Sequence, residues 1–204
     1  MTVGATAHGP TTVIRPGKST GWWGMFWLIA TESVLFGLLL FTYVYFRSGA
    51  SEWPPGGLPL PELQSTVIRS FLLVGSSIPM VLGERALEHK GNMEKTAVWI
   101  LVVLFLAAVF VVGHIQEMAV LMEEITPQRT AYGSVFITII NFHIAHVLVG
   151  MLILAYLLPH VLRGVFTKEN HSMVKLGAYY WHFVDVIWVF VFFLLYLSPH
   201  ILKT

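Results

Sequence analysis

Five long apolar segments constrain what this chain can fold into more than any other feature of the sequence. They cover residues 22–46, 65–87, 96–121, 134–158 and 175–197. Each is near or above the roughly 20 residues that an α-helix needs to cross the hydrocarbon core of a bilayer. The connections between them are short and polar. The pattern predicts an all-α fold, a polytopic bundle of five transmembrane helices.

Composition supports this class and excludes several functions. Hydrophobic residues make up 56% of the 204 and charged residues only 11%, against roughly 25% charged residues in an ordinary soluble domain. The formal net charge of +1, without a basic cluster, argues against a nucleic-acid partner. The absence of cysteine removes disulfides, thiolate catalysis, iron–sulfur clusters and Cys-ligated zinc. We expect a flexible cytoplasmic tail over residues 1–20 and a single transmembrane domain over residues 21–204.

The distribution of Lys and Arg predicts the orientation, because cytoplasmic loops carry an excess of both. The side that holds the N-terminus carries eight such residues, namely Arg15, Lys18, Arg85, Lys90, Lys95, Arg163, Lys168 and Lys175. The other side carries four, namely Arg47, Arg69, Arg129 and Lys203. The bias places the N-terminus in the cytoplasm and, after five crossings, the C-terminus outside.

Polar residues inside the apolar segments are the candidate functional groups, since such groups are costly in a bilayer and need partners. They are Glu32, His114, Glu117, Asn141, His143, His146, His182 and Asp185. One interhelical polar network is predicted near one membrane face. Its members are Glu117, His143, His146, and the pair His182 and Asp185. His182 and Asp185 lie three residues apart and therefore share a helix face. For this pair, a structural role is favoured over a direct chemical role. That structural role is a buried hydrogen bond that fixes how the helix packs.

Glu32 lies about ten residues into the first segment, with no basic residue within a turn on its own helix. If it faced lipid, desolvation would favour the neutral carboxyl. Two interpretations are equally open at this point. One is a protonated carboxyl that hydrogen-bonds to a neighbouring helix, and the other is a proton-handling or lipid-contacting site.

The histidines raise the question of a cofactor. His146 and His160 lie fourteen residues apart on one predicted helix, but no second helix offers a matching pair for a haem. His143 and His146 could share a metal ion only if Glu117 or His182 came close enough to complete the ligand set. Structural histidines are favoured. On the residues alone, a metal site at His143 and His146 stays open beside this structural interpretation.

Four stretches carry a family resemblance that covers nearly the whole chain. The last segment holds Tyr-Tyr-Trp-His-Phe-Val-Asp-Val-Ile-Trp over residues 179–188. The others are Tyr-Gly-Ser-Val-Phe over residues 132–136 with Phe-His at 142–143, Trp-Pro-Pro at 53–55, and Thr-Glu-Ser-Val-Leu-Phe at 31–36. The chain resembles subunit III of the haem-copper terminal oxidases, the cytochrome c and quinol oxidase complexes. Longer members of that family have seven helices, and many bacterial ones lack the first two and have five.

The resemblance implies a noncatalytic subunit of a respiratory complex that reduces oxygen to water and pumps protons. It implies direct contact with oxidase subunit I, further contacts with subunit II and other subunits, support of proton uptake, and a place in the bacterial cytoplasmic (inner) membrane. By the same resemblance, this chain has no catalytic residue, no metal ligand and no cofactor of its own. Haem and copper are expected in the partner subunits, and structural phospholipids are expected around this one. The candidate contacts with lipid or subunit I are Glu32, Trp53, Trp181 and Trp188. The chain departs from the family at His114, where many members have Gln, and around Pro79 to Glu84.

Two other functional classes stay open beside this one. The first is the related accessory subunit of a nitric oxide reductase. The second is an independent transporter, although the chain shows neither an inverted repeat nor paired broken helices. Near the predicted cytoplasmic side, Glu84, Glu88, His89 and His171 are expected in loops as candidate groups that collect protons.

Overall fold

The computed structural model describes residues 19–55, 58, 60–124 and 130–201. Most of the predicted tail, together with Arg129 and Lys203, lies outside these residues. The described helices are α1 (Thr20–Ser48), α2 (Leu63–Gly75), α3 (Ser77–Lys90), α4 (Met93–Glu124), α5 (Ala131–Leu162), α6 (Ser172–Val191), the π-helical segment η2 (Phe192–Leu197) and α7 (Ser198–Ile201). Five helical stretches are long and apolar enough to cross a membrane, with α2 and α3 together forming one of them. The predicted all-α, five-span fold is confirmed.

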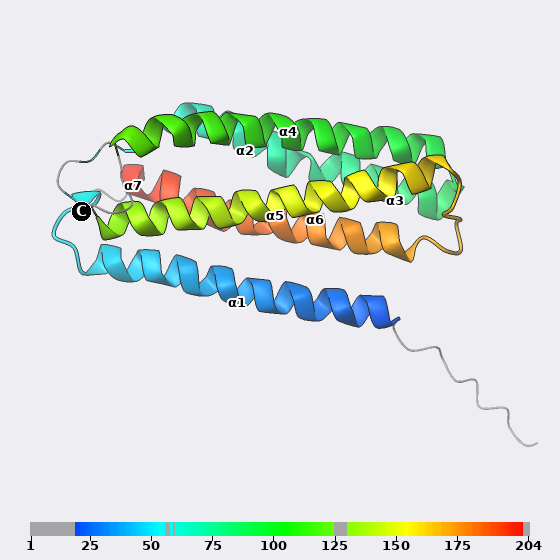
Figure 1. Cartoon of the computed structure of the whole chain (residues 1–204), viewed down its shortest axis with the longest axis horizontal. Helices are drawn as coiled ribbons and strands as arrows, with labels where there is room; N and C mark the ends of the chain where they lie inside the picture. Colours follow the sequence, from blue (N-terminus) through cyan, green and yellow to red (C-terminus); the bar gives the residue numbers. More distant parts are fainter. Residues whose placement is uncertain (1–18, 56–57, 59, 125–129, 202–204) are drawn as a thin grey trace, which may run out of the picture.

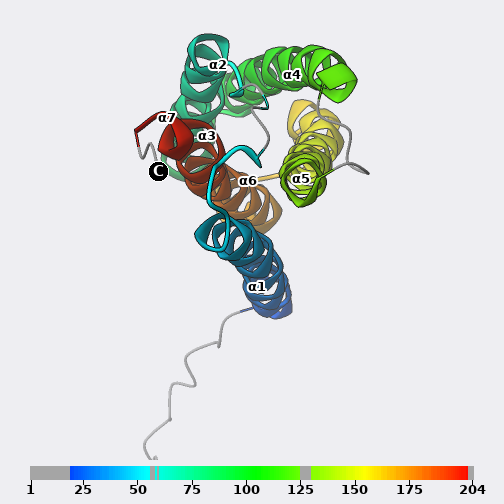
Figure 2. The same cartoon turned by 90° about the vertical axis from the view of Figure 1, so that its left-hand side faces the viewer.

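The long helices run side by side along one axis (Figure 1). In the end-on view, α6 lies between α1 on one side and α2 and α4 on the other (Figure 2), and it packs against α1, α2, α3 and α5. Half of the most apolar stretch of the last span is buried inside the bundle, against 6% of that of the first span. The signature segment of α6, residues 179–188, therefore lies in the centre of the bundle, and α1 lies at its edge.

The second span is interrupted at Ser76, three residues before Pro79. Proline has no amide hydrogen for the carbonyl oxygen of Gly75, and its ring crowds the preceding turn. The helical path nevertheless continues, because the amide of Ser76 donates to the carbonyl oxygens of Leu72 and Leu73 at 3.1 and 2.9 Å. α3 then ends at Lys90 and is capped by Gly91, whose φ of 60° is the left-handed conformation that favours glycine.

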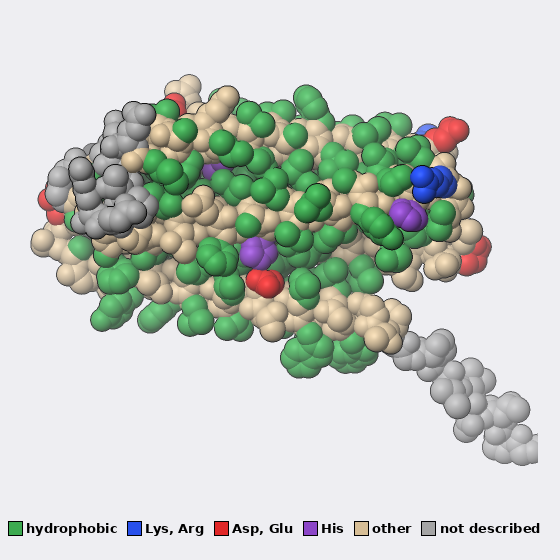
Figure 3. All heavy atoms as spheres, in the orientation of Figure 1, with side chains coloured by type: hydrophobic (Ala, Val, Ile, Leu, Met, Phe, Trp, Pro, Cys, Tyr) green, Lys and Arg blue, Asp and Glu red, His purple; other side chains and the backbone are tan. Residues whose placement is uncertain are grey.

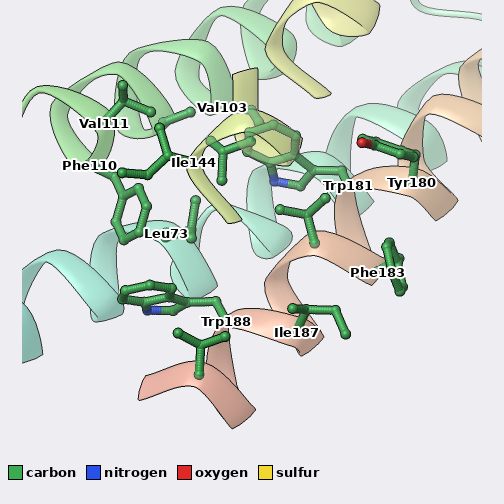
Figure 4. Close-up of a cluster of buried hydrophobic side chains, with 14 of the residues drawn as sticks. Leu73, Val103, Phe110, Val111, Ile144, Tyr180, Trp181, Phe183, Ile187 and Trp188 are labelled. Atoms are coloured by element: carbon green, nitrogen blue, oxygen red, sulfur yellow. The ribbon is translucent and has the colours of Figure 1, made fainter. Parts of the chain in front are cut away.

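The core is built around two fully buried tryptophans of α6, Trp181 and Trp188 (Figure 4). Trp188 packs edge-on against Phe110 of α4, with ring centroids 4.8 Å apart. Trp181 lies against Gly150 of α5, where an added Cβ would come within 2.9 Å of the indole. Glycine at this position is what lets α5 approach the tryptophan so closely.

The loop after α1 is anchored by Trp53. Its indole nitrogen donates to the hydroxyl of Tyr43 at 3.0 Å, and its ring lies edge-on to Tyr132 with centroids 5.0 Å apart. The peptide bond between Trp53 and Pro54 is cis. At the opposite end of the bundle, the expectation that Glu84, Glu88 and His89 lie in a loop is corrected, since all three belong to α3.

Figure 3 shows hydrophobic side chains over most of the visible surface, with Lys and Arg side chains toward one end. The exposed side chains of the long helices are predominantly large and apolar, including Phe41, Phe71, Phe105 and Leu152. A surface of this kind suits lipid or other membrane chains.

Candidate functional site

The Glu117 carboxylate forms an ion pair between α2 and α4. Oε2 of Glu117 lies 2.6 Å from Nη2 of Arg69, and the two side chains are 9% and 15% exposed. Thr66 donates its hydroxyl to Oε1 of Glu117 at 3.3 Å. A charge in a membrane span needs such a partner. Sequence analysis counted Arg69 only among the basic residues of the side opposite the N-terminus. Its place inside the apolar segment 65–87 was the signal that it pairs within the bundle.

Glu32 and His146 form a second pair, between α1 and α5. Nε2 of His146 lies 3.0 Å from Oε2 of Glu32, and Nδ1 lies 2.7 Å from the carbonyl oxygen of Phe142. Because a carbonyl can only accept, Nδ1 carries a hydrogen and Nε2 faces the carboxyl group. The pair can therefore share one proton between an imidazole nitrogen and a carboxylate oxygen. Its side chains are 15% and 30% exposed, so it is partly open to the surroundings of the bundle.

His182 and Asp185 meet through a serine of α3. Ser77 donates its hydroxyl to Oδ2 of Asp185 at 2.5 Å and lies 2.9 Å from Nδ1 of His182. Since the single hydroxyl hydrogen goes to the carboxylate, the imidazole Nδ1–H donates to the serine oxygen. The expected common face of His182 and Asp185 is present, and both side chains are used to hold α6 against α3.

Two further serines continue this arrangement along the second span. The indole nitrogen of Trp181 donates to Ser76 at 2.8 Å, and that of Trp188 donates to Ser70 at 2.9 Å. Small polar residues of this kind let transmembrane helices approach closely and hydrogen-bond across the interface. Sequence analysis missed these serines. The only signal in the sequence was that the two serines on the second span are separated much as the two tryptophans are on the last span, in the opposite chain order.

The remaining histidines pack as aromatic rings around Trp188. His114 and His143 are both fully buried, and each ring centroid lies 4.8 Å from that of Trp188. His114 also stacks on Phe110 at 4.4 Å. Within the described part of the chain, neither ring nitrogen of His143 has a hydrogen-bond partner.

The expectation of one continuous polar network is therefore corrected. The candidate groups divide into the pair of Arg69 and Glu117, the pair of Glu32 and His146, and the group that Ser77 makes with His182 and Asp185. Among the described residues, His143 makes no side-chain hydrogen bond to any of these groups. Over the described residues, no three His, Asp or Glu side chains are grouped so that they could hold a metal ion.

Two of the residues expected to contact lipid or subunit I are instead buried inside the bundle. Trp181 and Trp188 are 0% exposed and pack inside the bundle. Trp53 is partly buried against Tyr43 and Tyr132. The side chain of Glu32 is 30% exposed.

Comparison with known proteins places this arrangement in a family. A family model described as cytochrome c oxidase subunit III matches residues 3–199. A cytochrome c oxidase subunit 3 from Synechocystis sp. is 32% identical over 177 residues, covering 85% of this chain and 74% of the relative. A probable cytochrome c oxidase subunit 3 from Nocardia farcinica is 34% identical over 172 residues, covering 83% of each chain.

The relatives also include a quinol oxidase subunit. The cytochrome bo(3) ubiquinol oxidase subunit 3 of Pseudomonas aeruginosa is 30% identical over 177 residues, covering 84% of this chain and 82% of the relative. The match extends across all five spans and includes the signature segment of α6. The chain belongs to the cytochrome c oxidase subunit III family.

Proposed function

We propose that this chain is a noncatalytic membrane subunit of a haem-copper oxidase complex, in which it stabilises the catalytic subunit and supports proton uptake. The single observation that carries the proposal is the family match over residues 3–199. The relatives named above are oxidase subunits, which does not favour the nitric oxide reductase alternative. They include both a cytochrome c oxidase subunit and a quinol oxidase subunit, so the proposal holds for either electron donor.

The proposal extends to partners and placement. We infer direct contact with oxidase subunit I, association with subunit II and membrane lipids, and a place in the bacterial cytoplasmic membrane. A single transmembrane domain over residues 21–204 follows a cytoplasmic tail over residues 1–20. The outer face of α1 supports the contacts, because Phe36 and Tyr43 are the buried residues of that helix while Trp27, Leu38 and Phe41 are more than half exposed.

The proposal is tested by purifying a tagged copy from its native membrane in mild detergent. We expect haem absorbance in the purified sample, an accompanying chain that carries the haem and copper ligands, and oxygen consumption with reduced cytochrome c or quinol. A colourless protein that purifies alone would overturn the proposal and favour an independent transporter.

The proposed orientation can be tested because the chain has no cysteine. Two single-cysteine variants, Ser51→Cys and Glu169→Cys, serve as probes. Ser51 follows α1 and Glu169 lies between α5 and α6, so the two exposed positions are at opposite ends of the bundle. We expect a membrane-impermeant maleimide to label Ser51→Cys in intact spheroplasts, and to label Glu169→Cys only after the membrane is broken. The reverse pattern would place the N-terminus outside.

The proposed support of proton uptake rests on groups at the end of the bundle where α3 ends and α6 begins. Glu88 pairs with Lys175 at 2.8 Å, with Glu84, His89 and His171 on the adjoining turns. The test variant combines Glu84→Gln, Glu88→Gln, His89→Asn and His171→Asn. It should slow oxygen reduction first at high pH, where free protons are scarcest. Turnover of the purified complex measured across the pH range checks this. Turnover unchanged at every pH would exclude the role.

A further inference from the structure

α5 carries an amide side chain that faces the surroundings of the bundle from within the membrane span. Asn141 is exposed, and the large apolar side chains of Phe142 and Leu148 near it are 42% and 43% exposed. The amide of Asn141 makes no hydrogen bond to any of the described residues. We propose that Asn141 binds a transmembrane helix of an accompanying chain, which presents a hydrogen-bonding side chain to this amide. The inference rests on the proposed function, which makes this chain one member of a membrane complex.

Exposed hydroxyl groups elsewhere on the spans do not need such a partner. Thr31, Ser33 and Thr138 each donate to a carbonyl oxygen of their own helix, at 2.8, 2.7 and 2.6 Å. A hydroxyl can be satisfied in this way without a second helix. An asparagine amide has two donor hydrogens and an acceptor oxygen, and that of Asn141 uses none of them within the described part of the chain.

The depth of Asn141 decides what can satisfy it. α5 has 32 residues and is therefore about 48 Å long, of which about 30 Å lie in the hydrocarbon core of a bilayer. Asn141 comes ten residues after Ala131, the first residue of α5, or about 15 Å along the helix. In a centred helix it lies about 6 Å inside the hydrocarbon. Water and lipid headgroups are absent at that depth, and an unpaired amide is costly there, so the partner is a polypeptide side chain.

The turns on either side of Asn141 leave room for another helix. Ser134, Thr138 and Ala145 lie seven, three and four residues from Asn141, so they share its helix face, and all three are exposed or partly exposed. Small residues let transmembrane helices approach closely enough to hydrogen-bond across their interface. α5 also lies at the rim of the bundle in the end-on view (Figure 2).

This surface differs from the contacts considered so far. None of the four residues that the sequence analysis named as candidate contacts with lipid or subunit I belongs to α5. The outer face of α1 is a separate helix surface. Asn141 therefore adds a second lateral contact and states the chemistry of its partner.

Photo-crosslinking in the complex purified from its native membrane tests the proposal. Benzoylphenylalanine at Leu148, seven residues from Asn141 on the same face, should form an adduct with a transmembrane segment of an accompanying chain. Mass mapping should show an amide, hydroxyl or carboxyl side chain in that segment. An adduct with lipid alone, with a second copy of this chain, or with a wholly apolar segment would overturn the proposal.

Phe71 provides the control position for the crosslink. It is 76% exposed and belongs to α2, which lies away from α5 in the end-on view (Figure 2). Benzoylphenylalanine at Phe71 should not react with the segment captured from Leu148. Capture of the same segment from both positions would mean that the reaction does not report a specific contact, and would overturn the proposal.

A matched pair of substitutions tests the amide itself. Asn141→Leu should lower the yield of the adduct at Leu148 by roughly threefold, the factor that one interhelical hydrogen bond in a bilayer gives. Gln116→Leu removes an exposed amide of α4 and should leave the yield unchanged. Equal yields from the two variants would overturn the proposal.

The stability of the isolated chain separates a contact with a partner from a role within the fold. Because Asn141 makes no hydrogen bond to the described residues, Asn141→Leu should leave the unfolding midpoint of the isolated chain unchanged. A lowered midpoint would assign the amide to the fold of this chain and overturn the proposal. The haem spectrum of the purified complex reports on the proposed function separately. A haem-containing complex without the adduct at Leu148 would overturn this inference alone.

Discussion

Trp181→Ala should be among the most destabilising single substitutions in the bundle, with an expected loss of about 3 kcal/mol or more in the free energy of unfolding. The indole is 0% exposed and packs directly on Gly150. Its removal leaves a cavity where α5 meets α6. It also leaves the hydroxyl of Ser76 without the indole N–H, which donates at 2.8 Å.

Trp27→Ala is the matched control for this prediction. Trp27 lies on the outer face of α1 and is 62% exposed, so its truncation should cost no more than about 0.5 kcal/mol. Denaturant titration in mixed micelles, followed by helical circular dichroism, measures both variants. Equal losses would mean that the interface between α5 and α6 is not where the stability of the bundle resides.

The five spans could be predicted from the sequence because hydropathy and length depend on single residues. Their ends were less accurate. The predicted third and fourth spans, residues 96–121 and 134–158, extend in the structure to Met93–Glu124 and Ala131–Leu162. Helical hydrogen bonding continues through polar residues that hydropathy excludes, as where Thr130 accepts from the amide of Gly133 at 3.0 Å and caps α5.

The candidate site was only partly predictable, since pairing depends on how two helices are rotated and shifted against each other. Helical spacing placed His182 and Asp185 on one face, but it could not supply Ser77 from another span as their shared partner. Serine is nearly neutral in hydropathy, so hydropathy does not mark Ser77 as a polar partner inside an apolar helix. The partner of Glu32 was equally unpredictable, because His146 is more than a hundred residues away in the sequence, on another helix.

The ion pair between α2 and α4 gives the second large expected effect. Arg69→Met removes the cation and leaves the carboxylate of Glu117, which is 9% exposed, without a compensating charge. Breaking a buried pair on one side typically costs about 3–5 kcal/mol, whereas replacing both partners by apolar residues is often neutral or stabilising. We therefore expect a loss of about 3 kcal/mol in the single variant. The Arg69→Met/Glu117→Leu double variant should regain most of this loss.

The pair of Glu88 and Lys175 is the control for this cycle, because it joins the same kinds of charge over a similar distance in a more exposed place. Its atoms lie 2.8 Å apart, and its side chains are 37% and 32% exposed. Lys175→Met should cost much less than Arg69→Met, since water screens the carboxylate that remains. Unfolding titrations of the single and double variants give the comparison. The aliphatic stem of Arg69 packs against Gly113 of α4, where an added Cβ would lie 2.5 Å from Cδ of the arginine. If the double variant were as unstable as Arg69→Met alone, the cost would arise from the loss of this packing and not from an uncompensated charge.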